Sequence, residues 1–284
     1  MSTPVVAIHG GAGDRGAALL EHEARYHDAL LGALADARAA LEAGGGAVAA
    51  VRAAIVAMES CELFNAGRGS ALCSDGTVEM SAALMRSSDG AAGAVAAVRR
   101  TENPILAAAT VMESAQVLMV GDGVGERAGL PQRPNSYFVT ERQQAAGAGR
   151  DHGTVGAVCV DADGELAAGT STGGIRGQPP GRVGDTPIIG AGTWADRHVA
   201  VSCTGDGEAF VRVGVARYIA ALVGQGLSLS EAADRALGEV ASLEASGGLI
   251  AVDAHGNTAL PFLTKVMPRG VWRAGEEPAV WVVD

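Results

Sequence analysis

Short apolar runs flank pairs of alanine-rich stretches in both halves of the chain. In the first half, residues 17–43 predict one long helix that Gly44-Gly45-Gly46 would end, and residues 47–59 predict a second. In the second half, residues 206–223 and 229–243 predict another pair. Hairpins rather than helical crossovers connect the apolar runs. This order favours antiparallel sheets covered by helices over a doubly wound parallel sheet.

The composition predicts a core of small side chains, and the remaining expected elements are short. The chain has 284 residues, of which 41 are glycine and only 4% are aromatic, so we expect one large α/β core packed with small side chains. The expected strands are 5–8, 72–84 as a hairpin around Ser74-Asp75-Gly76, 91–98, 116–120, 154–160, 166–171, 199–203, 248–252 and 257–262, with short pieces around Val271 and Val280. Shorter helices are expected at 104–114 and 123–128.

Composition narrows the classes of function and partner. The net charge of −11 argues against a nucleic-acid partner, because phosphate backbones require a basic surface. The start Met1-Ser2-Thr3-Pro4 has no signal-peptide pattern, and no apolar run is long enough to predict a membrane span. The cysteines predict buried free thiols rather than disulfides; they are Cys61, Cys73, Cys159 and Cys203. Together these features predict a cytoplasmic protein.

The segment Gly153-Thr154-Val155-Gly156 opens an apolar run directly after a glycine-rich segment, 142–151, that is the best linker candidate in the chain. A threonine there is most simply an ordinary strand residue. If the chain were cut before Thr154, however, the new α-amine, with a pKa near ~7.7–8.0, could serve as the base for the threonine hydroxyl. Gly153 has no Cβ and therefore tolerates a twisted backbone at the bond to be cut.

A series of motifs in the rest of the chain favours the hypothesis that the chain is cut before Thr154. They are His9-Gly10-Gly11-Ala12-Gly13, Phe64-Asn65-Ala66-Gly67-Arg68-Gly69-Ser70, 168–174 (AGTSTGG), 180–185 (PGRVGD), 190–192 (GAG), 202–208 (SCTGDGE), 247–253 (GGLIAVD), Gly256-Asn257 and 260–262 (LPF). Together they resemble the plant-type asparaginase/isoaspartyl peptidase family of N-terminal nucleophile (Ntn) hydrolases, over nearly the whole chain except the linker.

The resemblance implies a fold and a maturation step. The implied fold is a four-layer α-β-β-α sandwich of two antiparallel sheets covered by helices, in one domain spanning residues 1–284. Cleavage between Gly153 and Thr154 would give an α chain, 1–153, ending in a mobile linker of about 142–153, and a β chain, 154–284.

The resemblance also implies a role for each matching residue of the site. Thr154 would be the nucleophile, and Thr172 would orient and polarise it. The Thr204 hydroxyl and the Gly205 N–H would form the oxyanion hole, and Asn65 would help to hold the nucleophile.

The substrate would be a zwitterionic aspartyl group. Arg182 would bind its α-carboxylate and Asp185 its α-ammonium, while Gly207 would leave room for the ligand and contact it, as would Gly205. The implied activity is hydrolysis of β-aspartyl (isoaspartyl) dipeptides and of L-asparagine through an acyl-enzyme, in a homodimer of αβ units. No cofactor is required, but the family binds a structural sodium ion through main-chain carbonyls, here those of Met58, Glu59, Cys61, Phe64, Ala66 and Arg68.

Several of these site residues also have a simpler, structural interpretation. Taken singly, Thr172 and Thr204 are ordinary strand residues, and Arg182 with Asp185 is a surface ion pair. His9 is interpreted as structural, and His152 as an exposed linker residue. The alternative functions are a glycosylasparaginase-like amidase and a non-cleaving pseudoenzyme that binds small amino acids.

The sequence departs from the family pattern in four ways. Ser81 replaces Asp in the segment Glu79-Met80-Ser81-Ala82, the loop 175–179 lacks an Asn-Lys pair, Leu263 and Lys265 replace a small polar residue and Glu, and the linker is short. None of these removes a residue assigned to chemistry, so the departures bear on substrate preference and on the rate of maturation.

Overall fold

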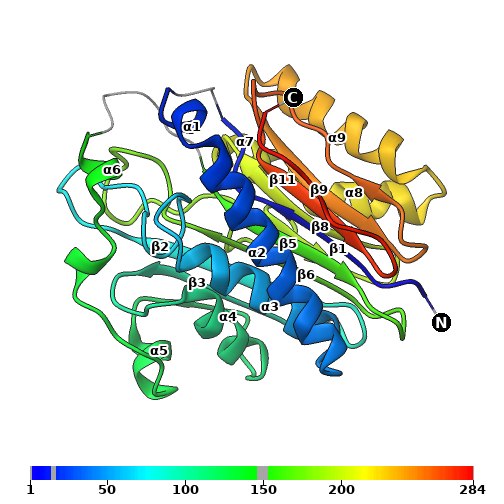
Figure 1. The fold of residues 1–284 in the computed structure, drawn as a ribbon, viewed down its shortest axis with the longest axis horizontal. Helices are drawn as coiled ribbons and strands as arrows, with labels where there is room; N and C mark the ends of the chain where they lie inside the picture. The colour runs from blue at the N-terminus through cyan, green and yellow to red at the C-terminus, as the bar shows by residue number, and fades with distance from the viewer. Residues whose placement is uncertain (1, 14–16, 146–152, 284) are drawn as a thin grey trace.

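Two β-sheets face each other at the centre of the molecule, and helices cover the outer face of each. A computed structural model describes residues 2–13, 17–145 and 153–283. The larger sheet has eight strands in the order β12-β11-β1-β5-β6-β2-β3-β4, and the smaller has four in the order β10-β9-β8-β7. Figure 1 shows α2, α3 and α4 on the larger sheet and α8 and α9 on the opposite side of the molecule. The predicted four-layer sandwich is therefore confirmed.

The strands are β1 (Val5–His9), β2 (Met80–Arg86), β3 (Ala92–Val98), β4 (Leu118–Val120), β5 (Val155–Val160), β6 (Leu166–Thr172), β7 (Thr193–Ala195), β8 (Val199–Gly205), β9 (Gly247–Asp253), β10 (Thr258–Ala259), β11 (Arg269–Arg273) and β12 (Ala279–Trp281). The helices are α1 (Ala17–Glu21), α2 (Glu23–Glu42), α3 (Gly46–Glu59), α4 (Pro104–Met112), α5 (Gly123–Arg127), α6 (Glu141–Ala145), α7 (Gly207–Val213), α8 (Val215–Gly224) and α9 (Leu229–Ser242), with a 3₁₀ turn η1 (Asn135–Tyr137).

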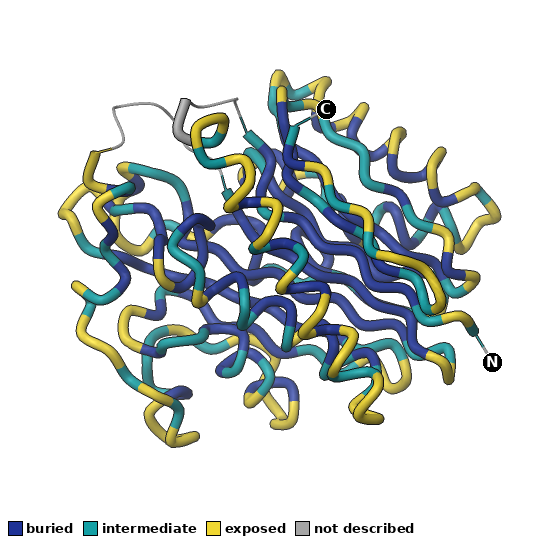
Figure 2. Tube along the Cα trace, in the orientation of Figure 1, coloured by how far each residue is buried: buried dark blue, intermediate teal, exposed yellow. Residues whose placement is uncertain are grey.

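The apolar core fills the three spaces between the four layers. Alternation along β5 illustrates this: Ala157 and Cys159 pack against the helices on the larger sheet, whereas Val158 and Val160 pack toward the smaller sheet. A third cluster lies between the smaller sheet and helices α8 and α9. Figure 2 shows the central strands as almost continuously buried, with exposure concentrated on the outer helices and loops. All four cysteines are free thiols, and three of them are buried, as predicted.

The larger sheet is not purely antiparallel, which corrects one expectation. β3 and β4 pair in parallel, with Ala94 opposite Leu118 and Ala96 opposite Val120. The reason is that α4 carries the chain from β3 back to the start of β4, and such a crossover joins parallel strands. The other pairs of neighbouring strands in both sheets are antiparallel.

Two predicted long helices are each divided. The stretch 17–43 contains α1 and α2, which meet at His22, where the main chain makes a turn to Leu19. The stretch 206–223 contains α7 and α8, which meet at Gly214 in the left-handed conformation, with φ of 67°. A glycine adopts this conformation without steric cost, so apolar periodicity can continue across a break that it does not reveal.

The predicted hairpin at 72–84 was wrong. A turn does form, with the Cys73 N–H donating to the Thr77 carbonyl at 2.8 Å, but the segments beside it do not pair as strands. Instead β2 pairs with β3 on one side and with β6 on the other. The predicted strand 257–262 is likewise reduced to β10, and β7 was not predicted.

The predicted mobile linker also needs correction at its start. Residues 142–145 belong to α6, and this helix is anchored. Arg142 Nε donates to the Glu62 carbonyl at 3.0 Å, and Gln143 Nε2 donates to the Gly69 carbonyl at 2.7 Å. Residues 146–152 lie outside the described part of the chain. Within that described part, no helix is both long and apolar enough to cross a membrane.

Candidate active site

Thr154 lies immediately before β5, in the middle of the larger sheet, and is almost completely buried. Val155 pairs with Ser171 of β6, which places Thr154 beside Thr172. The Thr154 hydroxyl donates to Thr172 Oγ1 at 3.0 Å, and Thr172 Oγ1 donates to the Gly153 carbonyl at 3.1 Å. The Gly174 N–H also donates to Thr172 Oγ1, at 3.0 Å, so the orientation of this hydroxyl is fixed. The structure thus brings together the residues predicted as nucleophile and orienting group.

Asn65 is the second donor to the Gly153 carbonyl. Its Nδ2 lies 2.7 Å from that oxygen and 2.7 Å from the Gly174 carbonyl. Its Oδ1 accepts from the Ala71 N–H at 2.6 Å, so both ends of the amide are held. Two donors on one carbonyl stabilise the negative charge that develops on its oxygen when the carbon is attacked.

The glycine loop after β1 lies against the bond between Gly153 and Thr154. A Cβ on Gly11 would lie 2.9 Å from Gly153 Cα and 3.0 Å from the Thr154 nitrogen. Gly11 also has a φ of 107°, which L side chains rarely adopt. The position therefore requires glycine for two independent reasons, and the loop lies directly against the predicted cleavage site.

The candidate oxyanion hole lies at the end of β8 in the facing sheet. Thr204 Oγ1 accepts from the Ala12 N–H at 3.1 Å, which leaves its own hydrogen available to donate to a substrate. Gly205 follows with a φ of 146°, packed so closely against Gly247 that a side chain would clash. Because Ala12 adjoins Gly11, the same loop contacts both the predicted cleavage site and Thr204, a predicted oxyanion donor.

The predicted substrate-binding residues form a cradle around Gly207. A Cβ on Gly207 would lie 2.8 Å from Asp185 Oδ1 and 3.1 Å from Arg182 Nη2. The space that this glycine leaves is therefore bordered by a carboxylate and a guanidinium, the two charges that a zwitterionic amino acid requires. Asp185 is buried, and its Oδ2 has no hydrogen-bond partner among the described residues. Burial raises the pKa of Asp185 to about 7, against the opposing effect of its own main chain and of Arg182.

Glu208 is a contact of the cradle that sequence reasoning missed. Its carboxylate binds the Arg182 guanidinium in the bidentate geometry, at 2.9 Å from Nε and 2.8 Å from Nη2. The simple interpretation of Arg182 and Asp185 as an ion pair is therefore wrong, because Arg182 pairs with Glu208. The sequence did contain a signal for this contact, since Glu208 directly follows Gly207 in the motif of residues 202–208. The Glu208 carboxylate occupies the guanidinium face that a substrate carboxylate would need.

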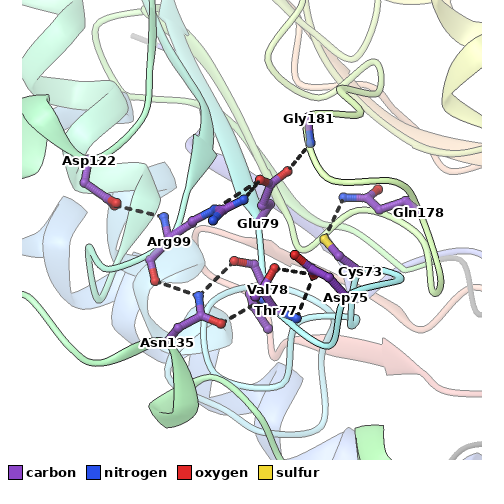
Figure 3. Close-up of polar contacts among 10 residues, drawn as sticks. All are labelled: Cys73, Asp75, Thr77, Val78, Glu79, Arg99, Asp122, Asn135, Gln178 and Gly181. Carbon is purple, nitrogen blue, oxygen red and sulfur yellow. Dashed lines mark hydrogen bonds and ion pairs between the residues drawn. The ribbon is translucent and has the colours of Figure 1, made fainter.

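Polar contacts of Glu79 and Gln178 support the loop that carries Arg182 (Figure 3). Glu79 Oε2 accepts from the Gly181 N–H at 2.6 Å, while its Oε1 accepts from Arg99 at 2.5 Å. Gln178 Oε1 accepts from the Ile175 N–H at 3.0 Å within the same loop. The contact with Glu79, the residue before β2, anchors the loop to that strand and holds the backbone next to Arg182 in place.

His9 is fully buried between the two sheets. Its Nε2 lies 3.0 Å from Ser202 Oγ, which in turn lies 2.7 Å from Thr170 Oγ1. Burial lowers the pKa of His9 to about 3, while a contact with the Thr154 main chain acts in the opposite direction. A neutral, internally bonded histidine agrees with the structural role expected from sequence. His152 lies outside the described residues.

The loop after α3 contains the expected sodium ligands. Its ends meet where the Arg68 N–H donates to the Glu59 carbonyl at 2.7 Å. The carbonyls of Met58, Glu59 and Cys61 each accept a main-chain hydrogen bond, and the Phe64 carbonyl accepts from Arg142 Nη2 at 3.4 Å. Each of these neutral oxygens has a second lone pair, which is the ligand chemistry that a hard cation prefers. Across residues 2–13, 17–145 and 153–283, no cluster of three or more His, Cys, Asp or Glu side chains could hold a metal.

Comparison with known proteins agrees with this geometry. A family model described as "Asparaginase" matches residues 2–150 and 142–282. The chain is 44% identical to "Isoaspartyl peptidase" of Escherichia coli (strain K12), over 99% of this chain and 97% of that protein. It is 39% identical to "Isoaspartyl peptidase/L-asparaginase" of Homo sapiens, over 96% of this chain and 94% of that protein. The chain belongs to the asparaginase family that this model defines, whose fold is the Ntn-hydrolase sandwich.

Proposed function

We propose that the protein is a self-processing amidohydrolase that cleaves β-aspartyl dipeptides and L-asparagine. The observation that carries the proposal is the Gly153 carbonyl, which accepts hydrogen bonds from Asn65 and Thr172 while the adjacent Thr154 hydroxyl lies 3.0 Å from Thr172 Oγ1. A strand-initiating glycine has no need of two side-chain donors on its carbonyl. A carbonyl that is to be attacked does.

Maturation begins when Thr154 Oγ attacks the Gly153 carbonyl carbon. The C–N bond then breaks, the hydroxyl proton passes to the departing nitrogen, and an ester joins Gly153 to Thr154 Oγ. Water hydrolyses this ester, which leaves a carboxylate on Gly153 and a free α-amine and hydroxyl on Thr154. The products are an α chain, 1–153, and a β chain, 154–284.

Substrate hydrolysis repeats this chemistry with an external carbonyl. The substrate α-carboxylate displaces the exposed Glu208 side chain and binds Arg182, while Asp185 binds the α-ammonium. The two contacts direct the side-chain carbonyl toward Thr154. Thr154 Oγ attacks that carbonyl with its α-amine as base, and Thr204 and Gly205 donate to the oxyanion. The amine leaves with a proton, and water then releases aspartate from the acyl-enzyme.

Three further features complete the proposal. The matured protein assembles as a homodimer of αβ units, acts in the cytoplasm, and carries a structural sodium ion on the carbonyls of the loop after α3. Such an ion would hold the loop that presents Asn65. Its chemistry is that of a hard cation on neutral oxygens, so its contribution is to loop geometry.

Activity assays on fresh and aged protein test the proposed function. Wild type should release aspartate from a β-aspartyl dipeptide and from L-asparagine in proportion to the cleaved fraction, and Thr154→Ala should release none. Glycosyl-asparagine as a third substrate separates the glycosylasparaginase alternative. A single chain that binds aspartate and hydrolyses none of the three would instead establish the pseudoenzyme.

A further inference from the structure

The two donors on the Gly153 carbonyl belong to distant parts of the fold. Asn65 lies in the loop after α3, and Thr172 ends β6. Both must be placed accurately for the carbonyl to be polarised, because a misplacement of about 1 Å can cost about 100-fold in rate. A residue that contacts both segments can fix their relative position, and Glu59, the last residue of α3, is such a residue.

The Glu59 side chain holds β6 next to Thr172. It is 1% exposed, and its Oε1 accepts from Ser171 Oγ at 2.6 Å and from the Ile105 N–H of α4 at 3.0 Å. Side chains alternate along a strand, so Ser171 faces the helical layer while Thr172 faces the Gly153 carbonyl. The hydrogen bond that holds Ser171 therefore also holds the backbone of β6 at Thr172, the next residue.

The Glu59 main chain holds the loop that presents Asn65. Its carbonyl accepts from the Arg68 N–H at 2.7 Å, which closes the loop on the end of α3. Gly67 packs directly on this carbonyl, with a φ of 51°, and leaves no room for a side chain. Glu59 therefore contacts both the loop that carries Asn65 and the strand β6.

A purely structural role would be to cap α4. The hydrogen bond from the Ile105 N–H satisfies one of the donors left open in the first turn of that helix. The bond from Ser171 contributes nothing to such a cap. A buried carboxyl is also costly compared with an apolar side chain, and burial raises the pKa of Glu59 to about 7. The hydrogen bond from Ser171 therefore indicates that Glu59 does more than cap α4.

We infer that Glu59 is a positioning residue for self-cleavage, which holds Thr172 through its carboxyl and Asn65 through its carbonyl so that both donors meet on Gly153. It touches no reacting atom. The inference rests on the proposed cleavage before Thr154 and extends it by naming what aligns the cleavage site.

The test compares the first-order rates at which freshly purified precursors become two fragments. Glu59→Ala removes the link and should slow cleavage by about 100-fold, the cost of a misplaced catalytic group. Ser171→Ala removes only the hydroxyl contact and should slow it by about ten-fold, the upper range for one hydrogen bond. Glu59→Gln keeps an acceptor oxygen and should remain within about three-fold of wild type.

The control is Ser228→Ala, which removes a helix cap on α9, far from this contact. Ser228 Oγ accepts from the Glu231 N–H at 3.3 Å in a capping box, so its loss mimics an ordinary capping defect. We expect cleavage at the wild-type rate. In the cleaved fraction of Ser171→Ala, kcat for a β-aspartyl dipeptide should fall while KM stays unchanged, because the Arg182 cradle is not affected.

The outcomes separate this inference from the proposed function. A wild-type chain that never cleaves would overturn the proposed function, and the inference with it. A cleaving wild type together with Ser171→Ala at the wild-type rate, or slowed no more than Ser228→Ala, would overturn the inference alone. If Glu59→Ala does not fold, Ser171→Ala and the recovery by Glu59→Gln decide the question.

Discussion

At the scale of single residues, the site is defined by short side chains that each make more than one hydrogen bond. Thr172 accepts from Thr154 and from Gly174 and donates to the Gly153 carbonyl. Asn65 is held at both ends of its amide. Such fully bonded groups do not have to reorganise when the carbonyl is attacked.

Removing the Thr172 hydroxyl should therefore impair maturation strongly. We expect Thr172→Ala to slow cleavage by about 10²–10³-fold, the cost of losing one donor to a developing oxyanion. Thr172→Ser keeps the hydroxyl and serves as the control. Densitometry of the precursor band over time measures both rates. Equal rates for Thr172→Ala and wild type would show that this donor does not take part.

Asp185 should give substrate binding a pH dependence. Its pKa of about 7 in the free protein means that it is neutral in acid and charged above that value. A neutral carboxyl offers no ion pair to the α-ammonium, so the inhibition constant of L-aspartate should fall as pH rises from 5.5 to 8, with a midpoint near 7. Asp185→Asn should bind more weakly and lose this dependence. A dependence that persists in Asp185→Asn would assign it to another group.

At the scale of elements, the strand register and the turn after β1 assemble the site. Antiparallel pairing of β5 with β6 places Thr154 beside Thr172. The glycine loop of residues 10–13 then lies against the bond between Gly153 and Thr154 and supplies the Ala12 N–H to Thr204. One loop therefore connects the proposed cleavage site of the larger sheet with the proposed oxyanion donors of the smaller sheet.

A side chain on this loop should block maturation without unfolding the protein. We expect Gly11→Ala to slow cleavage by at least about 100-fold, because its Cβ would press on the Gly153 and Thr154 main chain and displace the reacting atoms. Gly76→Ala is the matched control, since Gly76 has a φ of 78° but no atom within 4 Å of the place where the methyl group would lie. Cleavage of Gly11→Ala at the rate of Gly76→Ala would contradict the role of the loop.

The elements also show what the sequence could and could not predict. The strands around Thr154 and Thr172 and the division into sheets and covering helices followed from apolar runs and turns. The hairpin at 72–84 was wrong because a local turn does not specify which strand β2 pairs with, and that choice depends on contacts with β3 and β6. The side-chain contacts of Glu59 could not be predicted either, because they join residues brought together only by the tertiary fold.

The roles of Thr154, Asn65, Arg182 and Asp185 were assigned by resemblance, since threonine, amide and charged residues are individually common. What the structure adds is their arrangement, above all the shared carbonyl of Gly153 and the cradle at Gly207. The sodium ligands, the dimer and the compartment remain predictions.

At the scale of the whole molecule, the protonation of buried side chains makes the free energy of unfolding depend on pH. His9 lies at the centre of the sandwich, with a pKa lowered from 6.5 to about 3. Because the unfolded chain binds a proton that the folded chain does not, His9 contributes stability above pH 6.5 that is lost as the pH falls toward 3. Glu59 and Asp185, whose pKa values are raised, act in the opposite direction and lose their contribution as pH rises toward 7.

The His9 effect can be isolated by difference. In a Thr154→Ala background, which keeps one chain, the free energy of unfolding should fall by roughly 1.4 kcal/mol per pH unit below pH 6 relative to the same protein carrying His9→Asn. Urea titrations at pH 4.5, 5.5 and 7 measure this difference. Parallel pH profiles for the two proteins would mean that His9 is already charged in the folded state.

The most direct test is the intact mass and N-terminal sequence of the aged wild-type protein. We predict two fragments whose masses together equal the precursor plus one water, with the smaller beginning Thr154-Val155-Gly156, while Thr154→Ala keeps a single mass. A single wild-type chain that nevertheless hydrolyses a β-aspartyl dipeptide, or a fragment that begins at any other residue, would contradict a threonine nucleophile released by self-cleavage.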